Sequence, residues 1–276
     1  MEEQGPAEVR ESPIAGSWYP GKKEQLSAQI EDFLEAVPRQ ELHGEIVGLI
    51  CPHAGYAYSG HVAAWGYRQL VGKRYDTVAV VSPSHASYGG RVLVTRSRYY
   101  RTPLGLVELA HDLVAQLARE APVSFLGQDE EHSLEIQLPF LQHTLGSFSL
   151  VPVMLEDQSY ATASLVARAL APVLEGKRAL LVASTDLSHF HPYERALALD
   201  HRAIEAMGRF DPEGLHRGIN EGLFEACGYG AVAAVLLAAK AMGAKKVTLM
   251  KYANSGDVTG DRRSVVGYAS LAITTA

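Results

Sequence analysis

The sequence predicts a single three-layer α/β domain, in which helices cover both faces of a mixed, mostly parallel sheet. Short apolar runs typical of strands alternate along the whole chain with stretches whose apolar residues recur at helical spacing. The chain has 276 residues and no linker, repeat or low-complexity segment, so we favour one large domain over two small ones. Ligands of open α/β sheets bind outside the carboxyl ends of the strands. We therefore expect the functional residues to follow the predicted strands.

The elements can be assigned in chain order. A flexible arm is expected over residues 1–12, and the single domain, residues 13–276, begins with an aromatic turn at residues 16–21. Apolar spacing predicts the first helix over residues 25–37, which Pro38 ends. Further helices are predicted over residues 61–70, 110–120, 132–144, 161–174, 192–207, 210–221 and 230–242. Strands are predicted over residues 46–52, 77–84, 149–155, 179–184, 247–252 and 265–273, with a hairpin-like section over 91–108.

Composition and charge exclude several classes of protein. The net charge of -6 gives no broad attraction to nucleic acid or to an anionic membrane, since both favour basic surfaces. The first residues lack the basic start and apolar stretch of a secretory signal, and the most apolar helical stretch, residues 231–239, is too short to span a bilayer. Two cysteines are too few for a secreted disulfide scaffold. These features predict a cytoplasmic protein without nucleic-acid or membrane partners.

Side chains that can bind a metal ion stand at the ends of two predicted strands. His53 directly follows the strand at residues 46–52, and His85 directly follows the strand at residues 77–84. Histidine is the commonest metal ligand in proteins, and a lone histidine is about as often hydrogen-bonded within its own loop. The repetition of the same arrangement on a second strand favours the metal interpretation.

A third predicted strand, residues 179–184, leads to Asp186, His189 and His191. Alternate residues of an extended segment share a face, so both imidazoles can point one way, or only one can point inward. Pro192 reads as the first helical position and places His191 near a helix start, so we favour a functional His189 and a structural His191. Asp186 can bind a metal or can orient a neighbouring imidazole, and we favour the orienting role.

Two further residues are open to both structural and functional interpretation. The acids before His132, at residues 129–131, suit the start of a helix, where they meet the positive end of its dipole; this leaves His132 free to face a pocket. Cys227 precedes an apolar helix, and a thiol at a helix N-terminus has a lowered pKa and binds metal as thiolate. The alternative for Cys227 is a buried, inert cysteine.

A long polar loop, residues 254–263, follows the predicted strand at residues 247–252. It reads either as a turn between strands or as a pocket wall that binds an anion through Arg262 or Arg263. The sequence contains no Gly-x-Ser-x-Gly, no Walker A loop, no His-Glu-x-x-His and no Cys-x-x-Cys. An α/β-hydrolase serine, a P-loop, a zincin motif and a structural zinc site are therefore not expected.

At these residues the chain resembles the Memo family (mediator of cell motility), in its bacterial and archaeal branch. The likeness runs over nearly the whole chain from about Pro13. The motifs that carry it, in order, are Gly16-Ser17-Trp18-Tyr19-Pro20, Pro52-His53-Ala54-Gly55-Tyr56, Pro83-Ser84-His85, Tyr100-Arg101-Thr102-Pro103-Leu104, Glu131-His132-Ser133-Leu134-Glu135, Asp186-Leu187-Ser188-His189, Cys227-Gly228 and Tyr252-Ala253-Asn254-Ser255-Gly256-Asp257.

The resemblance implies a fold similar to class III extradiol dioxygenases, which are non-haem iron enzymes. In those enzymes two histidines and a glutamate hold Fe(II), and another histidine acts as acid/base. Carried over to this chain, His53 and His85 look like the histidine ligands and His189 like the acid/base, with Asp186 beside it. Cys227 falls where the dioxygenases have their glutamate, as in the Memo family.

The resemblance also implies ligands and partners. Animal Memo proteins are described as redox proteins that bind iron or copper, and as binding phosphotyrosine peptides in the same cleft with residues that match Trp18 and Tyr56. We expect these two residues, with His132, Asn254 and Asp257, to bind a small aromatic or anionic ligand or peptide. Prokaryotic members are often grouped with a radical-SAM protein and an AMMECR domain, which implies such partners here.

The thiolate is a chemical departure from the dioxygenase pattern. Two histidines and a carboxylate leave open positions for oxygen and a catechol, whereas a soft thiolate favours Cu(I) or Zn(II) and is itself open to oxidation. The function predicted first is a redox or dioxygenase-like protein with Fe(II), or copper, on His53, His85 and Cys227. The alternatives are a binding module without turnover and a zinc-dependent hydrolase, which needs three protein ligands and a bound water.

Overall fold

Four buried parallel strands form the centre of the sheet in the computed structural model, which describes residues 8–276. Their order is β8 (Ser149–Leu155), β3 (Thr77–Pro83), β9 (Ala179–Ser184) and β2 (Ile46–Cys51), each paired in parallel with the next. Every residue of β3 and β9 is buried, as expected for parallel strands that are covered on both faces. The predicted mixed α/β sheet is confirmed, and its parallel centre follows from these apolar runs.

Antiparallel strands extend the sheet beyond β2. Strand β12 (Val265–Thr274) pairs with β2, and β11 (Lys246–Asn254) pairs with β12 over most of its length. The short strand β10 (His189–His191) also pairs with β12, nearer its beginning. The beginning of β12 therefore lies beside the segment that carries His189.

The sheet extends beyond β8 through smaller strands. They are β6 (Gly105–Leu109), β5 (Tyr99–Thr102) and β1 (Val9–Arg10) in that order, with β4 (Val92–Thr95) and β7 (Val123–Leu126) alongside. The predicted hairpin-like section therefore contains three strands, of which β5 and β6 form an antiparallel pair.

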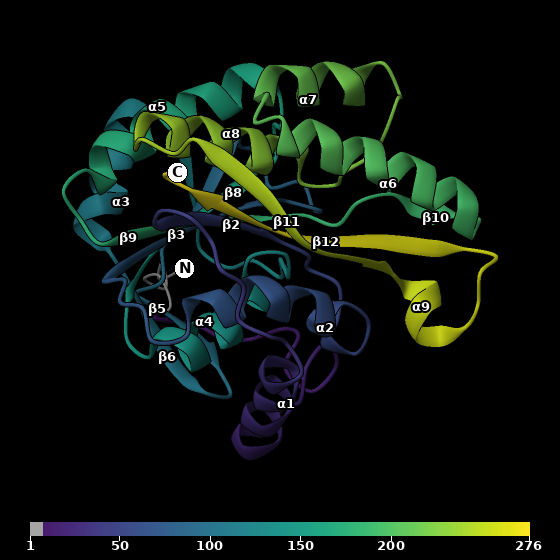
Figure 1. Cartoon of the computed structure of the whole chain (residues 1–276). Coiled ribbons are helices and arrows are strands. Elements are labelled where there is room, and N and C mark those ends of the chain that lie inside the picture. Colours follow the sequence, from purple (N-terminus) through teal and green to yellow (C-terminus); the bar gives the residue numbers. More distant parts are fainter. Residues whose placement is uncertain (1–7) are drawn as a thin grey trace.

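Helices form a layer on each face of the sheet (Figure 1). Alternate residues of β3 enter the two layers, because Ala79 and Val81 pack into one apolar cluster and Val78 and Val80 into the other. The first layer comprises α3 (His111–Glu120), α5 (Tyr160–Leu174), α6 (Tyr193–Gly208), α7 (Pro212–Asn220) and α8 (Tyr229–Ala241). The second comprises α1 (Lys23–Glu35), α2 (Tyr56–Tyr67) with the 3-10 turn η1 (Arg68–Leu70), and η2 (Glu135–Gln137) with α4 (Leu138–Leu145).

The start of the chain differs from the expected arm. Residues 1–7 of the predicted arm lie outside the described part of the chain. Residues 9 and 10, however, form β1 in parallel with β5, and the Arg10 side chain is buried. The prediction of a flexible arm as far as residue 12 is thus wrong for these two residues, because Arg10 has buried carboxylate partners that lie far along the sequence.

Other differences concern short elements. The helix predicted from residue 132 begins only at η2, and α9 (Ser255–Thr259) occupies part of the predicted polar loop. Strands β1, β7 and β10 were not predicted, because each has four residues or fewer and too little apolar alternation to be recognised.

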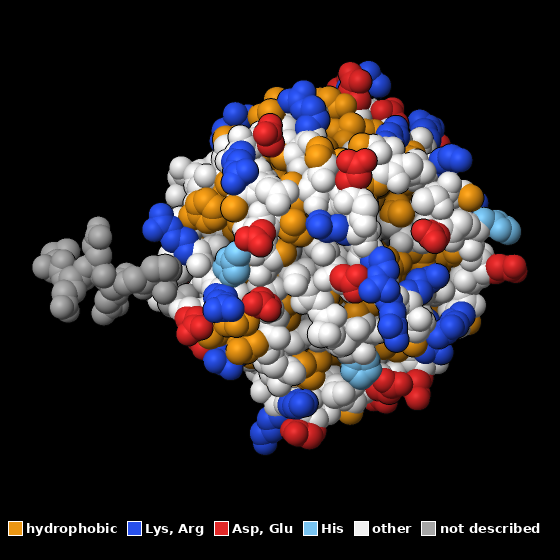
Figure 2. Space-filling model, turned by 90° about the vertical axis from the view of Figure 1, so that its left-hand side faces the viewer, with side chains coloured by type: hydrophobic (Ala, Val, Ile, Leu, Met, Phe, Trp, Pro, Cys, Tyr) orange, Lys and Arg blue, Asp and Glu red, His pale blue; other side chains and the backbone are white. Residues whose placement is uncertain are grey.

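A cavity of about 850 Å³ opens at the end of the sheet where the parallel strands begin. Its lining includes Ile46 of β2 and Ala179 of β9, and Lys73 and Arg178 stand among its charged residues. Figure 2 looks onto this end of the molecule, where basic and acidic side chains are interspersed. The residues with metal-binding chemistry lie at the opposite ends of the same strands. Within residues 8–276, no helix has the length and apolar character needed to cross a membrane.

Candidate metal centre

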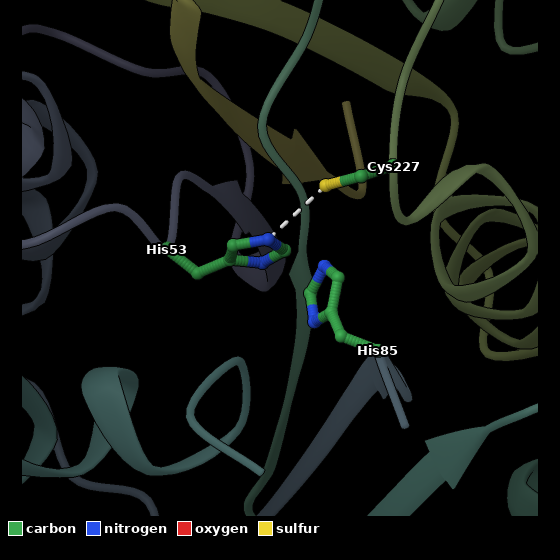
Figure 3. Close-up of side chains that lie close together, drawn as sticks. All are labelled: His53, His85 and Cys227. Atoms are coloured by element: carbon green, nitrogen blue, oxygen red, sulfur yellow. Dashed lines mark hydrogen bonds between the residues drawn. The ribbon is translucent and has the colours of Figure 1, made fainter. Parts of the chain in front are cut away.

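His53, His85 and Cys227 meet at the carboxyl end of the parallel strands. One potential ligand atom from each residue lies within 4.8 Å of those from the other two. His53 Nε2 is 3.1 Å from the Cys227 sulfur, and the rings of His53 and His85 are 5.2 Å apart and nearly perpendicular. Figure 3 shows both rings directed toward the space beside the sulfur. The three residues, although far apart in the sequence, therefore lie close enough together to bind one ion, as the metal-site prediction requires.

Ser184, the last residue of β9, fixes the orientation and tautomer of His53. Its hydroxyl donates to the Ser133 carbonyl at 2.6 Å and accepts from Gln137 Nε2 at 2.7 Å. The remaining contact of the hydroxyl, 3.1 Å to His53 Nδ1, must then be donated by the ring nitrogen. His53 Nε2 is left with its lone pair directed at the sulfur. Burial, together with the proximity of the His132 and His85 rings, holds the pKa of His53 well below its ordinary value.

Glu131 orients His85 in the same way. Its carboxylate accepts from the His85 ring nitrogen Nδ1 at 3.0 Å and from the His85 backbone N–H at 2.5 Å. The backbone N–H groups of His132 and Ser133 each donate at 3.0 Å to the same carboxylate. Burial alone would raise the pKa of Glu131, but the hydrogen bonds from His85 and Ser133 outweigh it and hold the pKa well below its ordinary value.

The hydrogen bond to Glu131 also determines which nitrogen of His85 is available. The bond to the carboxylate raises the pKa of His85 and leaves its Nε2 free. Glu131, His85 and His132 also lie close enough together to hold an ion. However, the four hydrogen bonds already occupy the Glu131 carboxylate, so this group serves as a support for His85.

Cys227 is held in the loop that leads into α8. Gln158 bridges this loop, because its side chain donates to the Cys227 carbonyl at 2.6 Å and accepts from the Gly230 N–H at 3.0 Å. The Asp186 N–H donates to the sulfur at 3.2 Å. Burial and the charge of Asp186 raise the pKa of the thiol. The sequence predicted a lowered pKa for this thiol at the helix start, and that prediction is wrong when only protein groups surround the sulfur. A bound cation is needed to favour the thiolate.

Asp186 ties the loop after β9 to the loop after β2. One oxygen accepts from the backbone N–H groups of His53 at 2.7 Å and Ala54 at 3.3 Å, and the other lies 3.9 Å from His53 Nε2. Burial raises the pKa of Asp186 to about 7, against the opposing effect of these hydrogen bonds. The geometry agrees with an orienting carboxylate that also lies beside the ligand atoms.

His189 and His191 differ in their surroundings. Glu225 accepts from the His189 backbone N–H at 3.3 Å and pairs with the His191 ring at 2.8 Å. The His191 ring is thus engaged at the molecular surface, whereas burial lowers the pKa of the His189 ring and leaves it neutral near pH 7. Phe190 between them is 74% exposed and has a φ of 62°, a strained conformation for a bulky residue.

The His132 ring lies close to both candidate ligand histidines, His53 and His85. It stacks on His85 with a centroid separation of 4.6 Å and lies 5.6 Å from His53. The Trp18 ring also packs against His132, with a centroid separation of 4.1 Å. Burial lowers the pKa of His132 to about 4, so it is neutral near pH 7. Trp18 and His132 thus form one partly exposed wall next to the three potential ligands.

The acids before His132 do not stand at a helix start, so that interpretation is wrong. Asp129 and Glu131 are buried, and η2 begins only at Glu135. Asp129 binds Arg10 of β1, and Glu131 binds His85. Their positions follow from these partners and not from a helix dipole.

Three other predicted ligand-binding residues have structural roles. Tyr56 is 2% exposed, and its hydroxyl donates to a backbone carbonyl in η2. Asn254 caps α9 by accepting from the Gly256 N–H at 2.9 Å, and Asp257 accepts the Asn254 N–H at 2.9 Å. These contacts give all three residues a structural role, and the ligand-binding role expected for them stays a prediction. Of the two loop arginines, Arg263 pairs with Asp261 and Arg262 lies over the Tyr193 ring.

Several supporting residues were not identified from the sequence. They are Glu131, Ser184, Gln137, Gln158 and Glu225, which hold the metal-binding candidates by the hydrogen bonds given above. Ser184 could have been found, because it ends a buried strand beside the one that carries His53. Gln137 lies in η2 and the other three lie in loops; the partners of all four are distant in the sequence, so they carry no local signal.

Comparison with known proteins gives consistent similarities. A family model described as "Memo-like protein" matches residues 10–272. The chain is 38% identical over 270 residues to a MEMO1 family protein of Methanosarcina mazei, a match that covers 96% of this chain and 99% of the relative. It is 39% identical over 277 residues to a MEMO1 family protein of Thermotoga neapolitana, with 95% and 98% covered.

A solved structure supports the architecture. The crystal structure of an uncharacterized protein from Escherichia coli K12 superposes with a TM-score of 0.54 at 16% sequence identity. The match covers 83% of this chain and 99% of the other. At this identity the likeness concerns the fold alone.

Proposed function

Because this chain belongs to the Memo-like protein family, we propose that it is a metal-dependent redox protein with one Fe(II) ion held by His53, His85 and Cys227. Two imidazoles and a thiolate are a donor set that suits first-row transition metals. When bound, such an ion supplies a redox centre with open coordination positions for oxygen or another small ligand.

The fixed tautomers of the two histidines carry this proposal. Both rings have Nδ1 engaged, His53 with Ser184 and His85 with Glu131, so both direct Nε2 to the space beside the Cys227 sulfur. Histidines that bind metal ions nearly always have their second nitrogen tied by a hydrogen bond in this way. A structural cluster of buried histidines has no need for two Nε2 lone pairs to face one thiol.

Neighbouring residues have roles that follow from their positions. The neutral His189 can accept a proton from a bound ligand near pH 7, and Asp186 keeps the His53 loop in place. The partly exposed wall formed by Trp18 and His132 suits an aromatic or anionic ligand that approaches the metal.

Anomalous scattering tests the proposal most directly. We expect crystals of anaerobically purified protein, grown without oxygen, to give an iron signal within bonding distance of the His53, His85 and Cys227 side chains. Copper or zinc at the same position would keep the ligand set and change the resident metal, and a redox-silent zinc site would favour hydrolysis. A folded protein with no metal at these residues would contradict the proposal.

Removal of the Ser184 hydroxyl is expected to weaken metal binding without unfolding the protein. The Ser184→Ala variant frees the His53 ring to rotate, and loss of such a support lowers metal affinity roughly 10- to 100-fold. It also leaves buried partners unsatisfied, which costs about 1–3 kcal/mol of stability. The measurement is competition of Fe(II) with a chelator, together with thermal unfolding.

Ser82 supplies the control for this experiment. It is fully buried in β3, and its hydroxyl has no hydrogen-bond partner among the described residues. We expect Ser82→Ala to bind metal as the wild type does. Equal affinities of the two variants would show that Ser184 does not orient a ligand.

A further inference from the structure

A buried arginine near the start of the chain connects to the loop that supports the metal centre. Only 3% of the Arg10 side chain is exposed. Its guanidinium donates to Asp129 at 2.7 and 2.9 Å, to Glu135 at 2.5 Å and to the Glu131 carbonyl at 2.7 Å. It also lies over the ring of Tyr100, with 4.8 Å from the guanidinium carbon to the centroid. The guanidinium therefore binds both ends and the middle of the segment 129–135.

The segment 129–135 has little regular structure of its own before η2. Residues 127–134 lie between β7 and η2, so helix or strand hydrogen bonds do not fix their conformation. The Asp129 carboxylate, which binds Arg10, also accepts from the Glu131 N–H at 3.1 Å. The position of Glu131 therefore depends on that of Arg10 through Asp129. Glu135 is held a second time, because Ser12 and Tyr19 donate to its other oxygen.

The same segment supports both candidate histidine ligands. Glu131 orients His85. Ser133 donates to the Pro83 carbonyl at 2.6 Å, beside His85, and its own carbonyl accepts from Ser184, the partner of His53. Any displacement of the segment therefore reaches His53 and His85 together.

We propose that Arg10 is a positioning residue of the metal centre, which acts through Glu131 and Ser133 on the two histidines. The inference rests on the proposed function, since it concerns the ligands named there. Burial of a charged cluster is a poor source of stability, because well-packed apolar residues can replace such clusters without loss. What an arginine adds is fixed, planar, multidentate geometry. That property matters where side chains must be held for metal binding.

The test compares Arg10→Lys with Arg178→Lys, using Co(II) as the probe. Arg178 makes a two-bond pair with Asp76, both at 2.8 Å, but lies exposed where the parallel strands begin. Lysine keeps the charge and loses the planar fork in both variants. We expect Arg10→Lys to bind Co(II) about 10- to 100-fold more weakly, as for lost supports of metal ligands, with altered visible bands. Arg178→Lys should match the wild type in affinity and spectrum.

Two further variants separate positioning from stability. The triple variant Arg10→Met, Asp129→Asn, Glu135→Gln removes the buried charges together, and it should fold yet bind Co(II) as weakly as Arg10→Lys. The Leu170→Ala variant creates a cavity in α5, far along the chain from this segment, so its melting temperature should fall with no change in Co(II) affinity. If Arg10→Lys lost melting temperature but kept wild-type affinity and bands, the positioning role would be overturned.

A measurement on the metal-free protein distinguishes failure of this inference from failure of the proposed function. The His85 amide donates to Glu131, so its NMR shift reports the position of the segment without any metal. We expect this shift to change in Arg10→Lys and not in Arg178→Lys. If the wild type bound no Co(II), the proposed function would fail while the amide shift still decided whether Arg10 positions His85. An unchanged shift would overturn the inference.

Discussion

Replacement of His53 by alanine is expected to reduce the metal content of anaerobically purified protein from about one equivalent to background. Two donors would remain, and three protein ligands are the usual minimum for a site that holds its ion and leaves positions open. Cys227→Ser should show a comparable loss, because a hydroxyl is a poor substitute for a soft thiolate. Elemental analysis of the purified variants measures both effects.

His143 supplies a matched control for the histidine substitution. Its ring pairs with Glu31 of α1 and has no contact with the three candidate ligands. We expect His143→Ala to retain the wild-type metal content. If His53→Ala and the wild type held the same amount of metal, His53 would not be a ligand and the proposed site would have to be abandoned.

Substitution of Gly228 by alanine is expected to displace Cys227 and to destabilise the fold. An added β-carbon would lie 2.3 Å from the Ser184 carbonyl oxygen and 2.9 Å from the Thr185 β-carbon. Both contacts are with the end of a central strand, which cannot move easily, so the loop that carries Cys227 must shift. Overpacking of this kind costs typically about 1–3 kcal/mol. Thermal unfolding and Fe(II) competition should both show a loss.

Gly127 allows the matched comparison. A β-carbon at this position would meet no atom within 4 Å, and its backbone has no left-handed conformation. We expect Gly127→Ala to leave both stability and metal affinity close to those of the wild type. A Gly228→Ala variant with wild-type affinity would show that the position of Cys227 is not critical for binding.

Much of the fold could be predicted from the sequence, because long apolar runs have few alternatives. The strands before His53 and His85 and the one before Asp186 are buried on both faces, so their whole length carries a signal. The carboxyl ends of parallel strands meet at one edge of the sheet, so the sequence alone predicts that the two histidines lie together. For Cys227, the family resemblance and its position before a predicted helix indicate a place in the same site.

The rest of the site depends on contacts between residues that are far apart in the chain. Arg10 and Glu135 are separated by 125 positions, and neither lies in a pattern that predicts a buried ion pair. The sequence around Glu131 is typical of the start of a helix, and this pattern gives no indication that Glu131 binds His85. Tyr56 and Asn254 were expected in the pocket, yet the Tyr56 hydroxyl donates to a carbonyl of η2 and the Asn254 side-chain oxygen caps α9.

The three candidate metal ligands, His53, His85 and Cys227, lie on loops that are far apart along the chain. A captured ion would therefore act as a cross-link between the loops after β2 and β3 and the entrance to α8. Loading and folding would then be parts of one equilibrium, in which free metal stabilises the native state by mass action. In a cell, scarcity of the ion would reduce both the chemistry of the protein and its lifetime.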